Sequence, residues 1–161
     1  MLAALRVMGR DNARTPVQWD ASPNAGFTTG TPWIPVNPDY PQVNAAAQID
    51  DPGSVFAHYR RLIALRHTEP AVAHGDFTML LPDDDAVYAF TRRHVDDRGE
   101  VELLVLGNFS DEEVRADVDG WDGAELVLGN YPDGGDGCVL RPWEARVHRR
   151  ILAPPKAAAA G

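Results

Sequence analysis

The chain has 161 residues, 44% of them hydrophobic, and a formal net charge of −9 at pH 7. This length suits one ordinary domain, or a small domain with an appendage. The acidic charge and the lack of a basic patch argue against nucleic-acid binding and against an anionic membrane surface, and they are compatible with neutral ligands such as sugars.

Cys138 is the only cysteine, so the chain has no internal disulfide and no CxxC-type metal site. Residues 1–6 are apolar but too short a stretch for a signal peptide, and no apolar run is long enough to span a bilayer. We therefore expect a cytoplasmic protein that does not act at a membrane. Residues 152–161, rich in Pro and Ala, are expected to form a disordered tail.

Residues 1–50 are predicted to be irregular. Prolines recur too often there for a helix or a central strand, at positions 16, 23, 32, 35, 38 and 41. The aromatic residues of the segment argue against disorder. Polar side chains are densest in residues 10–20, and loops of this kind usually carry function rather than packing.

Residues 51–67 are the clearest helix of the chain. Asp51 is a good N-cap, and Pro52 stands at the first helical position, where proline is tolerated. Apolar side chains and the stem of Arg66 recur on one face at helical spacing: Val55, Phe56, Tyr59, Leu62 and Ile63. Pro70 is predicted to end this amphipathic helix.

Residues 75–151 read as an all-β region. Short apolar runs alternate with turns rich in Gly and Asp, a pattern typical of a small antiparallel sandwich. Residues 101–109 are apolar enough to predict a buried central strand. The predicted strands are residues 76–81, 86–94, 101–109, 113–118, 124–128, 138–140 and 145–151.

Arg10 and Arg14 are the candidate substrate-binding residues. A guanidinium group in a polar cleft can hold a sugar hydroxyl or a partner carboxylate through several donors. The alternatives are a surface ion pair with Asp11 for Arg10, and a structural clamp on loop carbonyls, the more common role, for Arg14. Asp11 and Asp20 are candidate acid–base groups, although aspartates in such loops more often cap helices or form Asx turns.

Aromatic side chains offer a second type of sugar contact. Trp19, Phe27 and Trp33 could stack on sugar rings, but such residues more often form the core of a compact loop. Trp121 and Trp143 are the aromatic candidates in the β region, where core packing is the more common role.

The sequence predicts neither a metal nor another cofactor. The five histidines are scattered without an HxxxH pairing, and the Asp-rich residues 83–85 and 133–136 lack the order of an EF-hand, so both are predicted turns. There is no GxSxG motif, no P-loop and no GxGxxG motif. Cys138 lies in a predicted strand and is expected to be buried and inert.

Five segments together resemble the α-glucosidases and oligo-1,6-glucosidases of the α-amylase family, glycoside hydrolase family thirteen. Residues 10–20 and 22–38 are similar to the region after the last barrel strand of these enzymes, and residues 51–66 to their final barrel helix. Residues 104–110 and 140–145 are similar to their C-terminal β-sandwich. The resemblance covers nearly the whole chain.

The resemblance implies a parallel (β/α) barrel with its site at the C-terminal ends of the strands. The family's retaining mechanism uses an Asp nucleophile, a Glu acid/base and a third Asp, and no residue of this chain matches any of the three. Arg10 matches the arginine that, with an upstream acidic residue, binds the 4-hydroxyl of the non-reducing-end glucose and gives exo-action. Gly9 and Val17 depart from the family's usual serine and methionine.

We therefore predict a mixed fold, in which residues 1–70 are the end of a catalytic barrel, namely its last βα loop and final helix, and residues 75–151 a small antiparallel β-sandwich. The predicted function is that of the C-terminal fragment of a retaining, exo-acting α-glucosidase for malto- or isomalto-oligosaccharides. Its expected partners are an upstream barrel portion and an α-linked gluco-oligosaccharide, and the chain alone is expected to be inactive because the catalytic acids are missing.

Three alternatives stay open. The chain could belong to a trehalose synthase or sucrose isomerase relative, it could be a stand-alone accessory or sugar-binding module, or it could be a truncated or mis-started gene product.

Overall fold

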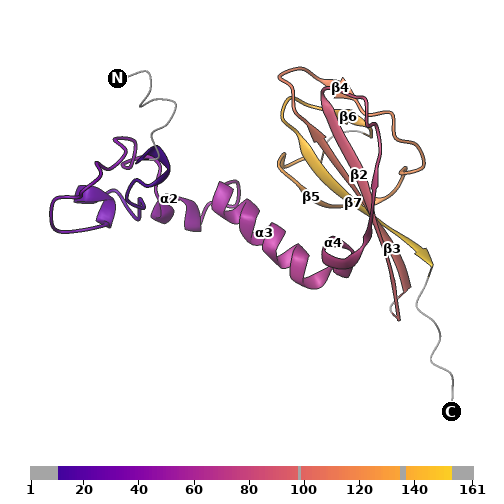
Figure 1. Ribbon diagram of the computed structural model, residues 1–161, viewed down its shortest axis with the longest axis horizontal. Helices are drawn as coiled ribbons and strands as arrows, with labels where there is room; N and C mark the ends of the chain where they lie inside the picture. Colours follow the sequence, from indigo (N-terminus) through magenta and orange to yellow (C-terminus); the bar gives the residue numbers. More distant parts are fainter. Residues whose placement is uncertain (1–10, 98, 135–136, 154–161) are drawn as a thin grey trace, which may run out of the picture. The chain divides into compact units, whose positions relative to one another are not determined.

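The computed structural model describes residues 11–97, 99–134 and 137–153 (Figure 1). The chain divides into two compact units, Met1–Arg60 and Arg61–Gly161. The helix α3, Val55–Thr68, runs through the boundary between them.

The first unit is mostly irregular, as the prolines predict. From residue 11 up to α3, its regular elements are two single turns of 3-10 helix, η1 (Asp11–Ala13) and η2 (Pro23–Gly26), and one short helix, α2 (Ala45–Ile49). Figure 1 shows the loops that join them in indigo and violet. The aromatic residues of this unit do not form a loop core: Trp33 is 92% exposed and Trp19 54%, because backbone and polar side-chain hydrogen bonds fix the loop instead.

The helix α3 begins four residues later than the sequence predicts. Asp51 does not cap it, because its carboxylate accepts a hydrogen bond from the Gly53 amide (2.8 Å) and so closes an Asx turn. Ser54 takes the capping position, where its hydroxyl accepts from the Ala57 amide at 3.1 Å. The helix ends at Thr68, just before Pro70, as predicted.

The apolar side chains of α3 are exposed. Val55 is 67% exposed, Tyr59 61% and Ile63 54%, and Ala57 is the buried residue of this helix. The amphipathic pattern therefore identifies an apolar face of α3 that is suited to packing against another part of a protein. Within the described residues no other element covers this face.

The second unit begins within α3, at Arg61, and the short helix α4, Pro70–His74, follows. The carboxylate of Glu69 accepts a hydrogen bond from the Ala71 amide (3.2 Å) and caps this helix, with Pro70 at its first position. The strands that follow are β1 (Asp76–Met79), β2 (Val87–Asp96), β3 (Gly99–Asn108), β4 (Val114–Arg115), β5 (Glu125–Gly129), β6 (Val139–Leu140) and β7 (Ala145–Ala153).

The strands form two antiparallel sheets, which confirms the antiparallel β region predicted from the sequence. The larger sheet has the order β1-β2-β3-β7-β5, and β4 pairs with β6 in the smaller one. Figure 1 shows β4 and β6 at the end of the larger sheet that lies away from α4. As predicted, the apolar strand β3 is central, and it pairs with β2 on one side and β7 on the other.

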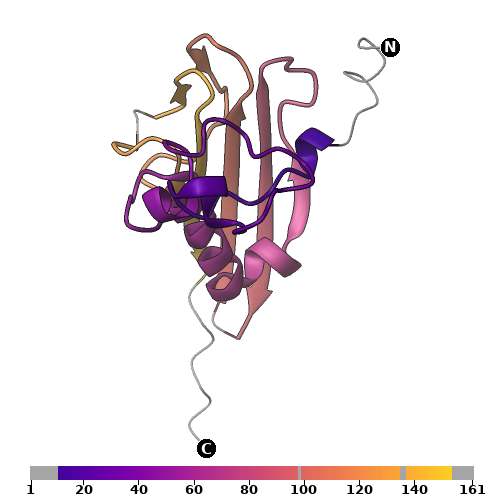
Figure 2. The same cartoon turned by 90° about the vertical axis from the view of Figure 1, so that its left-hand side faces the viewer.

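The core lies on one face of the larger sheet. Alternate residues of β2 and β3 point into it, and Leu140 of β6 closes it: the buried set is Val87, Ala89, Leu104, Leu106, Ala116 and Leu140. On the opposite face α4 packs against β2 and β3 (Figure 2), and the Arg92 guanidinium donates to the Ala71 carbonyl at 3.3 Å. Burial on both faces explains why the centre of β3, residues 103–106, is continuously apolar.

Two residues of the second unit differ from their predicted places. Cys138 precedes β6 in a turn, is partly buried, and donates its thiol to the Val118 carbonyl at 3.4 Å. Trp143 is 59% exposed with a φ of 56°, because it sits in the turn before β7 rather than on an inward-facing strand position. By contrast Trp121 packs against the core, as predicted.

Candidate functional site

The loop region from residue 11 to residue 44 holds the site candidates of the sequence, and its backbone is fixed by its own hydrogen bonds. The amides of Trp19 and Asp20 both donate to the Ala25 carbonyl, at 2.9 and 3.3 Å. Asn24, with a left-handed φ of 56°, donates from its side chain to the Thr28 carbonyl (3.1 Å) and the Gly30 carbonyl (3.0 Å). The side chain of Asn24 thus holds the loop through hydrogen bonds, in place of an apolar core.

Two further amide side chains tie the loop region to itself. The side chain of Gln18 donates to the Asp39 carboxylate (2.9 Å) and to the Val43 carbonyl (2.5 Å). Asn44 is buried, caps α2 by accepting from the Ala47 amide (2.9 Å), and donates to the Tyr40 carbonyl (2.8 Å). Much of the polar density that marks this loop therefore determines its shape.

Asp20 forms the Asx turn that the sequence suggests. Its carboxylate accepts from both the hydroxyl and the amide of Ser22, the amide at 2.8 Å, and these two bonds hold the pKa of Asp20 below its ordinary value. A general acid needs a raised pKa, so Asp20 has the opposite property.

The two candidate arginines differ in what the structure says of them. Arg10 lies outside the described residues. Arg14 is exposed, and across the described residues its side chain makes no hydrogen bond or ion pair, so it does not clamp the loop carbonyls there. Its guanidinium is therefore available for a ligand or for a part of the protein beyond the described residues.

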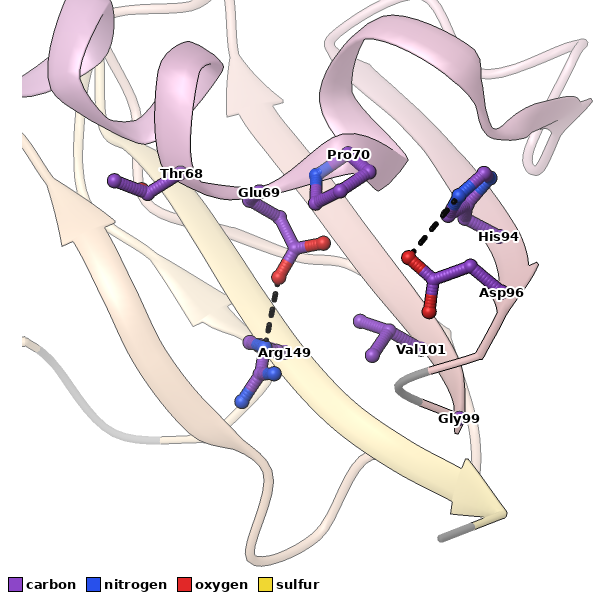
Figure 3. Close-up of a pocket in the computed structure, with 8 residues that line it drawn as sticks. All are labelled: Thr68, Glu69, Pro70, His94, Asp96, Gly99, Val101 and Arg149. Atoms are coloured by element: carbon purple, nitrogen blue, oxygen red, sulfur yellow. Dashed lines mark hydrogen bonds and ion pairs between the residues drawn. The ribbon is translucent and has the colours of Figure 1, made fainter. Parts of the chain in front are cut away.

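A pocket in the second unit gathers acidic and basic groups beside α4 (Figure 3). Glu69 accepts a hydrogen bond from the Arg149 guanidinium at 2.9 Å, and the His94 ring lies 3.7 Å from the Asp96 carboxylate. The pocket holds only about 90 Å³, below the roughly 300 Å³ at which small-ligand sites begin. The Glu69–Arg149 pair joins the start of α4 to β7, and the pocket leaves no room for a sugar.

A larger groove lies at one end of the sheet and encloses about 630 Å³. We call it the Trp121 groove. It is lined by Asp76, Thr78, Leu80, Leu81, Thr91, Arg93, Glu102, Asp117, Val118, Asp119, Trp121 and Arg150. Its volume falls within the range of small-molecule sites.

A buried cluster of charged residues lies at the start of β7. This cluster was not predicted from the sequence. Glu144 and Arg146, each 1% exposed, are joined by a hydrogen bond of 2.8 Å, and Arg141 donates to Glu144 as well. Arg146 also donates to the Gly137 and Val139 carbonyls, at 2.9 and 2.7 Å. The cluster fixes the turn before β6, and the one sequence signal for it is three charges within residues 141–146 of an apolar region.

Within the three described stretches, no group of three or more His, Cys, Asp or Glu side chains could hold a metal ion. No helix in the same residues is long and apolar enough to cross a membrane.

Comparison with known proteins identifies a family and several relatives to which the chain is similar. The family described as "Alpha amylase, catalytic domain" matches residues 1–75. Oligo-1,6-glucosidase of Heyndrickxia coagulans is 44% identical over 91% of this chain, and that of Parageobacillus thermoglucosidasius 45% identical over 88%. The chain spans about a quarter of these relatives, 26% of each.

Solved structures agree with this placement. Trehalose-6-phosphate hydrolase of Bacillus licheniformis is 35% identical and superposes with a TM-score of 0.81, covering 93% of this chain and 28% of that one. Isomaltulose synthase of Klebsiella sp. LX3 is 36% identical with a TM-score of 0.80, covering 92% of this chain and 27% of that one. The resemblance predicted from the sequence is confirmed: this chain is related, over nine-tenths of its length, to part of the oligo-1,6-glucosidases of the α-amylase family.

Proposed function

We propose that this chain forms one end of a retaining, exo-acting α-glucosidase that hydrolyses α-glucosidic bonds in isomalto- or malto-oligosaccharides. The observation that carries the proposal is the 44% identity to an oligo-1,6-glucosidase over 91% of the chain. Glucan 1,6-alpha-glucosidase of Streptococcus pneumoniae, 39% identical over 90% of the chain, supports the same class of bond.

In this proposal residues 1–70 complete a (β/α) barrel with its last βα loop and final helix, and residues 75–151 form the C-terminal sandwich. The match of residues 1–75 to a catalytic domain supports the first assignment. The core shared by the two antiparallel sheets supports the second. The nucleophile and the acid/base then belong to an upstream barrel portion, so the chain alone has no glucosidase activity.

We assign substrate contact to Arg10 and a supporting contact to Arg14. The exposed side chain of Arg14, without a partner among the described residues, supports a role outside the loop itself. The hydrogen bonding of the loop supports the assignment of Arg14 as well, because Arg14 is not among the side chains that hold the loop residues described above.

The test is a chimera. The segment of the Heyndrickxia coagulans oligo-1,6-glucosidase that matches this chain is replaced by the chain itself, and hydrolysis of isomaltose is measured. We expect an active enzyme. In that chimera Arg10→Ala should lower kcat/KM by about 10- to 100-fold, as loss of a hydrogen bond from a charged group would.

The matched control is Arg115→Ala, which removes an exposed arginine of the β region and should leave kcat/KM unchanged. A folded but inactive chimera would refute the proposed function. A fully active Arg10→Ala chimera would refute the role of Arg10 and leave the rest standing.

A second candidate is a sucrose isomerase relative, favoured by the similarity to isomaltulose synthase. A related structure, of MutB, was solved with the substrate sucrose. The same exchange into isomaltulose synthase, with the products of sucrose separated, distinguishes the two. Isomaltulose formed there, together with an inactive glucosidase chimera, would favour the isomerase.

A further inference from the structure

The Trp121 groove is formed within the second unit by two kinds of structure. Its floor is the end of the larger sheet, where Thr78 of β1 and Thr91 of β2 are directly paired. Its rim is the loop of residues 117–121 that follows β4. Both are parts of one compact unit, so the groove belongs to the fold of the β region.

The rim is held rigidly to the floor by Arg150. Its guanidinium donates to the Glu102 carboxylate (2.9 Å) on β3 and to the Gly120 carbonyl (2.6 Å) in the rim. The same guanidinium lies 4.1 Å from the centre of the Trp121 ring, and Trp121 also packs against the core. The groove is therefore preformed, which lowers the entropic cost of binding.

The floor carries a hydroxyl that lacks a hydrogen-bond partner among the described residues. Thr91 is only 7% exposed, and among the described residues its hydroxyl makes no hydrogen bond. In the same residues no side-chain oxygen or nitrogen is both fully buried and without a partner, so this hydroxyl is reached from the groove. The hydroxyl of a largely buried residue that lines a groove is a hydrogen-bonding position for whatever fills the groove.

The charges of the groove select the class of ligand. Four carboxylates (Asp76, Glu102, Asp117 and Asp119) face two guanidinium groups (Arg93 and Arg150), an excess of two negative charges. This excess disfavours phosphates, nucleotides and acidic sugars. Sugar hydroxyls both donate and accept, so they can bond to carboxylates, guanidinium groups and threonine hydroxyls in the same groove, while Trp121 offers apolar surface to a sugar ring.

We propose that the Trp121 groove binds a neutral oligosaccharide, with one sugar hydroxyl bonded to Thr91 and a ring placed against Trp121. The choice of gluco-oligosaccharides as probes rests on the proposed function. The groove itself does not, because the lining residues named above all belong to the second unit.

The test is a titration of the full chain with isomaltotriose and with maltotriose, followed by amide NMR shifts. We expect saturable shifts in β1, β2 and the 117–121 loop. Thr91→Val keeps the shape of the side chain and removes the hydroxyl, so it should raise the dissociation constant by about two- to tenfold. Thr91→Ser keeps the hydroxyl and should restore binding.

Thr68→Val is the matched control, since Thr68 lines the small pocket of Figure 3 and not the groove. Asp119→Asn, on the exposed rim, gives a second variant should Thr91→Val fail to fold, and it should also weaken binding. The absence of saturable shifts, or unchanged affinity in the groove variants, would overturn the proposal. Saturable shifts with calcium but with neither sugar would overturn the sugar assignment.

These outcomes are independent of the chimera assay. Binding is measured on the chain alone, without catalysis, so failure of the groove proposal leaves the glucosidase assignment standing, and the reverse holds as well.

Discussion

At the scale of single residues, Glu144 and Arg146 form a charged pair in which each side chain is 1% exposed. Burial alone would raise the pKa of Glu144, but hydrogen bonds from Arg141 and Arg146 lower it from 4.5 to about 2. Glu144→Gln leaves the Arg146 guanidinium buried without a counter-charge, so we expect a loss of about 3–5 kcal/mol in the free energy of unfolding, measured by urea denaturation at neutral pH.

The pH dependence follows from the same carboxyl group. A carboxyl with a lowered pKa in the folded state stabilises the fold fully above pH 4.5, and this contribution is lost as the pH falls toward about 2. The Glu144→Gln variant should lose less stability over that interval than the unmodified chain. Asp117→Asn, at an exposed ion pair with Arg115, is the control and should change stability by about 1 kcal/mol or less. Equal effects of the two substitutions would contradict this account.

Roles that depend on short-range geometry could be predicted from the sequence. Asp20 forms an Asx turn because the carboxylate needs only its neighbour Ser22. The burial of an aromatic ring depends instead on residues far along the chain. Trp121 packs against the core and Trp143 does not, although both stand beside turns, and no local pattern separates them.

At the scale of elements, alternation in β2 and the apolar run of β3 were sufficient to predict both strands, because burial in β2 follows the period of two and β3 is buried on both faces. The start of α3 was not predicted correctly. Asp51, Pro52 and Gly53 suit both a helix start and a turn, and the hydrogen bond from the Gly53 amide to Asp51 selects the turn. The groove beside Trp121 was not predicted either, since four strands and two loops meet there.

The loop around η2 depends on Gly26. Its φ is +67°, and a β-carbon added there would lie 2.7 Å from the Asp20 carboxylate, so Gly26→Ala meets both backbone strain and a clash. We expect the substitution to open the loop, seen as amide exchange at Trp19 faster by about tenfold, the equivalent of 1–2 kcal/mol.

Gly30→Ala is the control, because Gly30 lies outside the left-handed region and its nearest neighbouring atom would be 3.7 Å away. Exchange at Trp19 should be unchanged in that variant. Equal acceleration by both substitutions would mean that the Asp20–Ser22 turn does not depend on Gly26.

At the scale of the whole molecule, the two units should differ in local stability. The β region has a packed core and paired central strands, whereas the loop region before α2 is held by hydrogen bonds between largely exposed residues. We expect amides of residues 11–50 to exchange faster than those of β2, β3 and β7. Uniform protection along the chain would contradict the proposal that the first part needs the remainder of a barrel.

The central claim is that this chain helps to form a glucosidase but supplies none of the acids that break the bond. The most direct measurement is release of p-nitrophenol from p-nitrophenyl α-glucoside by the purified chain, beside a buffer blank and the active chimera. The account predicts a rate equal to the blank for the chain and turnover for the chimera. Turnover by the chain alone, at a rate proportional to its concentration, would contradict it.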